Sequence, residues 1–207
     1  AGGRLEGAEM ARNAANATRP GRPARPSRPP ARVLETAGPA PRHYGGGVVG
    51  FDIAGAEAGF PAGNLRDAFD FLAHNFIPAT VHAGEADGLD SIRGALFDGR
   101  ALRLGHGVRL AEDVHTARED DENTYVTLGP LAQWVKDREI ALETSPTSNL
   151  QTGAIAAWGD DILDHPFDLL YQLGFRVTVN TDNRLMSGTT LPPHLRILAD
   201  PFADART

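Results

Sequence analysis

The chain has 207 residues, a formal net charge of −7 and no cysteine. This length suits one domain with a hydrophobic core, and the absence of cysteine excludes disulfides and thiolate metal sites. Any metal would therefore be bound by His, Asp or Glu side chains. No apolar stretch approaches the roughly 20 residues that cross a membrane, and the start lacks the apolar region of a secretory signal. We therefore expect a cytoplasmic protein with no membrane partner.

The first 44 residues differ in composition from the rest of the chain. They contain eight Arg and three Glu, a charge of +5, so the remainder carries −12. The run "RPGRPARPSRPPAR" (19–32) has Pro every few residues, and we expect 1–44 to be disordered or locally polyproline II. A linker or a non-native start is the favoured interpretation, because the run has no aromatic residues to stack on bases. The alternatives are a basic arm for nucleic acid or an acidic partner, and GC-rich DNA translated in the wrong frame. The acidic remainder argues against a nucleic-acid partner.

Residues 45–207 are predicted to form one domain in which strands and helices alternate. Apolar runs predict strands at 48–57, 77–85, 102–107, 140–149 and 175–183, the fourth of which runs into a polar loop. Apolar residues at helical spacing predict helices at 64–76, 89–99, 128–139 and 165–174. The acidic run 118–124 is predicted to be a solvated loop, and His165 to be a cap or loop contact. The alternation, at roughly 25–37 residues per repeat, predicts a parallel sheet with helical crossovers.

Side chains that can do chemistry follow the predicted strands. They are Asp52 and Glu57, His82 and Glu85, His106, the stretch 143–149, and Asp182. Such groups gather at the carboxyl ends of the strands in a (β/α)8 barrel. No GxGxxG or Walker loop follows any strand, which disfavours folds that cradle a nucleotide. The sequence therefore predicts an α/β fold of the TIM-barrel type.

Three of these side chains form a candidate metal site. His82, His106 and Asp182 would supply neutral or anionic nitrogen and oxygen ligands at one barrel mouth, which suits Zn2+. Such an ion lowers the pKa of a bound water toward neutrality and makes hydroxide available. Glu85 would then move protons, if apolar surroundings raise its pKa. The alternatives stay open: His82 taken alone is more often a satisfied core residue, and Glu85 is equally well a loop carboxylate or helix cap.

Five blocks of the sequence resemble the adenosine deaminase family, a branch of the metal-dependent amidohydrolases. They are "VVGFDIAGAE" (48–57), "TVHAGE" (80–85), "RLGHG" (103–107), "SPTSN" (145–149) and "VTVNTDN" (177–183). The resemblance implies a (β/α)8 barrel, of which this chain holds about the last five strand–helix units. It also implies hydrolytic deamination of adenosine or 2′-deoxyadenosine to inosine or deoxyinosine with release of ammonia, a step of purine salvage.

The resemblance assigns a role to each matching residue. His82 is similar to a ligand of the single zinc ion, and Asp182 to the carboxylate that binds zinc and holds the attacking water. Glu85 resembles the acid that protonates purine N1, and His106 the histidine that orients and helps activate the hydroxide without being a ligand. Gly55 resembles the backbone group that contacts purine N3.

The chain departs from the family pattern at two places. Asn183 stands where many members have a second aspartate, so its amide would donate to purine N7 without needing a protonated acid. The HxH motif that supplies two further zinc ligands occurs nowhere in the sequence. We therefore expect a C-terminal fragment, or the product of a truncated or misframed gene, that is incomplete as an enzyme on its own.

Other functions stay open at this point. One is deamination of a different aminopurine, such as adenine or a modified adenosine. Another is a non-catalytic remnant that binds a nucleoside weakly or acts as a partner subunit. Binding of nucleic acid through the basic tail ranks last. The oligomeric state is not predicted.

Overall fold

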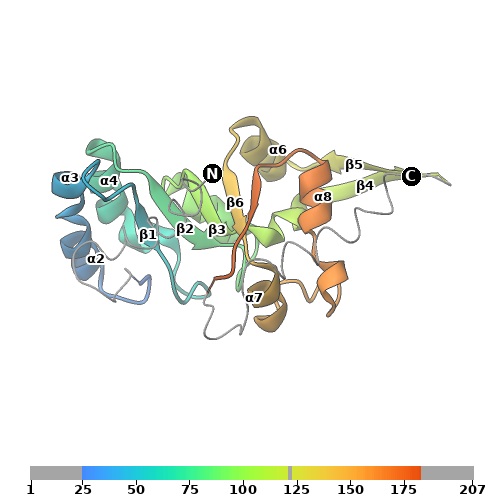
Figure 1. Ribbon diagram of the computed structural model, residues 1–207, viewed down its shortest axis with the longest axis horizontal. Helices are drawn as coiled ribbons and strands as arrows, with labels where there is room; N and C mark the ends of the chain where they lie inside the picture. Colours follow the sequence, from blue (N-terminus) through green and yellow to red (C-terminus); the bar gives the residue numbers. More distant parts are fainter. Residues whose placement is uncertain (1–24, 121–122, 183–207) are drawn as a thin grey trace. The chain divides into compact units, whose positions relative to one another are not determined.

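The computed structural model describes residues 25–120 and 123–182 (Figure 1). The chain divides into two compact units. Among the described residues, the first unit comprises 25–83 and 90–105, and the second unit comprises 84–89, 106–120 and 123–182.

Parallel strands and the helices between them build the first unit. Its strands β1 (Phe51–Ile53), β2 (Ala79–Ala83) and β3 (Arg103–His106) are neighbours in that order, although His106 itself belongs to the second unit. β1 and β2 run parallel, with Phe51 opposite Ala79. The 3-10 turn η1 (Ala62–Leu65) leads into α4 (Arg66–His74), and α5 (Leu89–Phe97) precedes β3. The core of this unit includes Ile53, Leu65, Phe69, Leu72, Ile92 and Leu104.

Two helices lie in the segment that was expected to be a disordered tail. They are α2 (Pro30–Ala37) and α3 (Ala40–His43), shown beside α4 in Figure 1. Val33 and Ala37 are fully buried and lie one turn apart, and α2 packs against α4. Pro30 occupies the first turn, where proline costs no hydrogen bond. The prediction of disorder or polyproline II is therefore wrong for 30–43, while residues 1–24 of that segment lie outside the described residues.

A second parallel pair of strands belongs to the second unit. β6 (Ala141–Thr144) runs parallel to β7 (Val177–Val179), with Leu142 opposite Val177. The helices of this unit are α6 (Pro130–Asp137), α7 (Pro146–Gln151) and α8 (Phe167–Gln172), with 3-10 turns η2 (Val108–Asp113) and η3 (Ile162–Asp164). Its buried apolar residues include Val108, Leu110, Val135, Leu142, Ile155 and Leu170. The predicted alternation of strands and helices is thus confirmed.

The buried carboxylate of Asp113 fixes the start of α6. Its Oδ2 accepts the main-chain N–H groups of Leu131 at 2.9 Å and Ala132 at 2.8 Å. These N–H groups have no partner within the helix, and a negative charge at this end is favourable. Gly129 is required beside it, because a Cβ at that position would lie 2.0 Å from Asp113 Oδ1.

The structure departs from the sequence prediction at two other places. The acidic run 118–124 was predicted to be a loop, but β4 (Val114–Glu119) and β5 (Thr124–Leu128) pair as an antiparallel hairpin around it. The described residues of the run are exposed, as expected. The block "SPTSN" was predicted to be a polar loop, and it instead enters α7 at Pro146. No helix in the described ranges is both long and apolar enough to cross a membrane.

The packing of α2 gives a test of the folded tail. Replacing Val33 with Ala removes two buried methyl groups, so we expect the free energy of unfolding to fall by about 2 kcal/mol. Urea unfolding followed by circular dichroism measures the change. The matched control is Glu35→Ala, an exposed position on the same helix, where we expect a change below about 1 kcal/mol. Equal midpoints for the two variants would show that α2 is not part of the folded unit.

Candidate functional site

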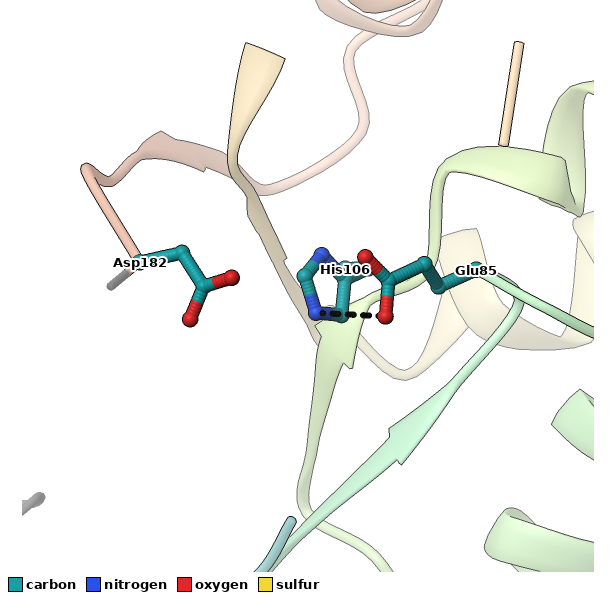
Figure 2. A group of neighbouring side chains, drawn as sticks. All are labelled: Glu85, His106 and Asp182. Carbon is teal, nitrogen blue, oxygen red and sulfur yellow. Dashed lines mark ion pairs between the residues drawn. The ribbon is translucent and has the colours of Figure 1, made fainter. Parts of the chain in front are cut away.

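Three polar side chains of the second unit converge on one point. Glu85 lies in the bend after β2, His106 is the last residue of β3, and Asp182 follows β7. One ligand atom from each lies within 4.8 Å of the other two, and His106 Nε2 is 3.3 Å from Glu85 Oε2 (Figure 2). The set offers one nitrogen and two carboxylate donors, a chemistry that suits Zn2+. All three were predicted from the sequence as site residues, and the structure brings them together, although the predicted metal set contained His82 in place of Glu85.

The backbone of this site is strained at two positions. His106 has φ of +65° and Asp182 has φ of +51°, both in the left-handed region. Residues other than glycine seldom adopt this conformation, which costs roughly 1–3 kcal/mol at each position. Such strain is concentrated at functional sites, because the surrounding contacts must hold it. Phe76, Arg100 and Glu139 have positive φ away from the site, so this conformation is consistent with a functional role of His106 and Asp182 but does not mark it by itself.

The short helix α7 supports both carboxylates. The Ser148 hydroxyl donates to Asp182 Oδ2 at 2.8 Å, and the hydroxyl of Thr152, just past the end of α7, donates to Glu85 Oε1 at 3.1 Å. A carboxylate that accepts such hydrogen bonds has fewer side-chain orientations available. The sequence predicts that "SPTSN" lies near the site, but it does not predict these contacts. The signal was available as hydroxyl residues four positions apart, which lie on one face of a helix.

A buried hydrogen-bonded network lies behind His106. Asn149 is fully buried, and the exposed fractions of His106 and His165 are 3% and 4%. Asn149 Nδ2 is 2.9 Å from His106 Nδ1, and His165 Nε2 is 3.2 Å from Asn149 Oδ1. His165 Nδ1 accepts the N–H of Phe167 at 3.0 Å, which confirms the predicted cap or loop contact at the start of α8. Burial lowers the pKa of His165 to about 4, so its ring is neutral at pH 7.

His82 and Gly55 belong to the first unit. His82 Nε2 is 3.6 Å from Asp52 Oδ1, across the pairing of β2 with β1. The His82 ring packs against Gly105, where a Cβ would lie 2.3 Å from His82 Cδ2. Gly55 has φ of +133°, a conformation that favours glycine. Asn183, the remaining predicted site residue, lies outside the described residues.

Comparison of the sequence with known proteins identifies one family. The model of the adenosine deaminase family matches residues 24–203. The adenosine deaminase of Mycobacterium sp. (strain JLS) is 50% identical over 172 residues, which are 83% of this chain and 45% of that protein. The chain thus spans less than half the length of this curated relative.

Solved structures confirm the fold. An adenine deaminase from Arthrobacter aurescens has a TM-score of 0.69 and 22% identity over 85% of this chain and 48% of that one. An amidohydrolase from Burkholderia ambifaria, solved with bound Zn, has a TM-score of 0.62 and 18% identity over 79% of this chain and 41% of that one. At these identities the likeness shows the fold alone, and it agrees with the predicted TIM-barrel type.

The low pKa of His165 makes stability depend on pH. The unfolded histidine takes up a proton below pH 6.5, whereas the folded one does so only near pH 4. Between these values the unfolded state binds more protons, so the free energy of unfolding falls as the pH falls, by about 3 kcal/mol from this residue. The difference between the wild type and His165→Gln should therefore shrink by that amount between pH 7 and pH 4, measured by urea unfolding at each pH. A constant difference would contradict a buried, neutral His165.

Proposed function

This chain belongs to the adenosine deaminase family, and from that premise we propose that it takes part in zinc-dependent hydrolytic deamination of adenosine and 2′-deoxyadenosine. The products are inosine or deoxyinosine and ammonia, so the reaction serves purine salvage. The observation that carries the proposal is the convergence of Glu85, His106 and Asp182 within 4.8 Å. An acid, an imidazole and a second carboxylate are the groups that this reaction needs.

Each side chain has a part in the chemistry. Glu85, in its protonated form, donates to purine N1, which makes C6 electrophilic. His106 orients the water that attacks C6, and Asp182 accepts a hydrogen bond from it. The water oxygen bonds to C6 while one water proton passes by way of Asp182 to the amino nitrogen. The C6–N6 bond then breaks and ammonia leaves, as the remaining proton of the attacking oxygen returns to Glu85 and N1 keeps the proton it received. Water and adenosine are thus converted to inosine and ammonia with no other reactant.

The proposed zinc ligands are His82 and Asp182, with one ion per site. A bound Zn2+ would supply a water whose pKa lies near neutrality. In the described residues Glu85 and His106 lie beside Asp182, and the roles proposed for these two are proton transfer to the purine and orientation of the water. The sequence contains no HxH motif, the pattern expected to supply two more ligands. A polypeptide that carries this motif therefore belongs in the test.

Two further residues are proposed to contact the purine. The main chain at Gly55 would approach N3, since glycine adds no side chain of its own between the backbone and the ring, and its positive φ is consistent with a close approach. The Asn183 amide would donate to N7. A cytoplasmic location, the absence of a nucleic-acid partner and a single domain over 45–207 stay predictions.

Adenosine is favoured over other aminopurines by the relatives. The adenosine deaminase from Mycobacterium is 50% identical, whereas the adenine deaminase with a similar structure is 22% identical. Substrate choice follows the residues of a pocket, which diverge as identity falls. If the chain converted adenine or N6-methyl-AMP faster than adenosine, adenosine would not be the preferred substrate, and the faster compound would take its place in the proposal.

The test follows conversion of adenosine to inosine by ultraviolet absorbance. The purified chain is assayed with Zn2+, both alone and with a polypeptide that carries the HxH strand of a relative. We expect conversion in at least the second mixture, and Glu85→Gln should lower the rate at least about 100-fold, since general acid catalysis contributes that much.

Glu119→Gln is the matched control, because Glu119 is an exposed carboxylate on β4 of the same unit. It should retain the wild-type rate. Failure of both mixtures to convert adenosine, or equal rates for Glu85→Gln and the wild type, would contradict the proposal. Nucleoside binding without conversion would support a non-catalytic role instead.

A further inference from the structure

We propose that Asn149 and His165 are positioning residues that hold neutral His106 as the tautomer with its proton on Nε2. The Nε2 atom beside Glu85 is then a hydrogen-bond donor and has no lone pair to take a proton. The tautomer follows from the hydrogen bonds of the second unit alone. Its catalytic meaning, that His106 orients the attacking oxygen without deprotonating it, rests on the proposed function.

A main-chain N–H group fixes the tautomer of His165. The N–H of Phe167 can only donate, and it lies 3.0 Å from His165 Nδ1. His165 Nδ1 must therefore accept, so it carries no proton. Because burial keeps the ring neutral, with a pKa of about 4, the single ring proton is on Nε2. His165 Nε2 accordingly donates to the atom of Asn149 that lies 3.2 Å away.

A second main-chain group fixes the orientation of the Asn149 amide. The N–H of Ser145 lies 3.1 Å from the same Asn149 atom, and this N–H can also only donate. Two donors therefore point at one atom, which must be the carbonyl oxygen Oδ1. The other end of the amide is then the NH2 group. It lies 2.9 Å from His106 Nδ1 and donates to it.

The hydrogen bond from Asn149 fixes the tautomer of His106. Since His106 Nδ1 accepts from Asn149, it carries no proton, and the neutral ring has its proton on Nε2. This N–H points to Glu85 Oε2 at 3.3 Å (Figure 2). His106 is 3% exposed and Asn149 is fully buried, so bulk water cannot easily replace these bonds. The main-chain N–H groups of Phe167 and Ser145 thus determine which ring nitrogen of His106 carries the proton, although neither group contacts His106.

Replacing the amide NH2 group of Asn149 with an oxygen should move the proton of His106 to the other ring nitrogen. In Asn149→Asp the first carboxylate oxygen still accepts from Ser145 and His165, but the second replaces a donor with an acceptor facing His106 Nδ1. We expect Nδ1 of His106 to become protonated. Long-range proton–nitrogen correlation spectra of the 15N-histidine-labelled chain report which ring nitrogen carries the proton, and loss of the signals in His106→Gln assigns them.

Asn180→Asp is the matched control for the added carboxylate. Asn180 also lies in the second unit and is half-buried, but its amide donates to the Thr144 carbonyl and the Thr178 hydroxyl instead of to a histidine. The His106 spectrum should be unchanged in this variant. His165→Gln is the conservative variant: its amide NH2 can still donate to Asn149 Oδ1, so we expect it to keep the Nε2–H tautomer.

Where the chain converts adenosine, kcat should fall at least tenfold in Asn149→Asp, with KM changed less than threefold, and His165→Gln should retain most of kcat. The inference is overturned if wild-type His106 carries its proton on Nδ1, or if a folded Asn149→Asp leaves Nδ1 unprotonated. If Asn149→Asp does not fold, the wild-type spectrum decides by itself. A chain that never converts adenosine but shows Nε2–H on His106 would contradict the proposed function and not this inference.

Discussion

The buried amide of Asn149 is the group on which the rest of the second unit's site depends. It accepts from Ser145 and His165 and donates to His106, so both ends of the amide have partners. Each buried polar group left unpaired would cost about 1–3 kcal/mol. If the Asn149 amide were flipped, its NH2 group would face the Ser145 and His165 donors. The amide therefore keeps one orientation, and the His106 ring that it contacts is held with it. The same helix carries Ser148, whose hydroxyl holds Asp182, so α7 aligns two site residues at once.

In the second unit, hydrogen bonds from α7 hold the two site residues whose backbone conformation is unfavourable. His106 and Asp182 have positive φ, which is uncommon for residues other than glycine, although His and Asp adopt it more often than most. Their contacts to Asn149 and Ser148 come from a helix that begins at Pro146, whose fixed φ suits a first turn. In the first unit a different constraint applies to His82, because its ring fills the space that a side chain at Gly105 would occupy. Each unit thus positions its candidate residues by close packing and hydrogen bonds of its own.

Much of this arrangement could be predicted from the sequence. The alternation of apolar runs with amphipathic segments gave the strands and helices in the correct order, and the placement of Glu85, His106 and Asp182 after strands indicated that they would meet. The helix α2 could not be predicted, because its sequence continues a proline-rich run and offers only one apolar pair, Val33 and Ala37. That pair stabilises a helix only because α4 packs against it.

The remaining differences have physical reasons of the same kind. The hairpin of β4 and β5 has mostly exposed side chains, so its sequence lacks the apolar alternation that predicts a half-buried strand. The network of Asn149 and His165 joins residues 16 positions apart through a buried contact, and local sequence patterns carry no record of such a contact. The roles of individual site residues likewise depend on a bound ion and substrate and stay predictions.

Equilibrium dialysis of zinc tests whether Asp182 helps to hold a single zinc ion. The chain is dialysed together with the HxH polypeptide, and Asp182→Asn is compared with Asp160→Asn, an exposed position in the same unit. Asparagine tolerates the left-handed backbone at 182, so the comparison isolates the charge. We expect one zinc per chain, with affinity lowered at least tenfold in Asp182→Asn and unchanged in Asp160→Asn. Equal affinity for zinc in all three proteins would contradict this expectation.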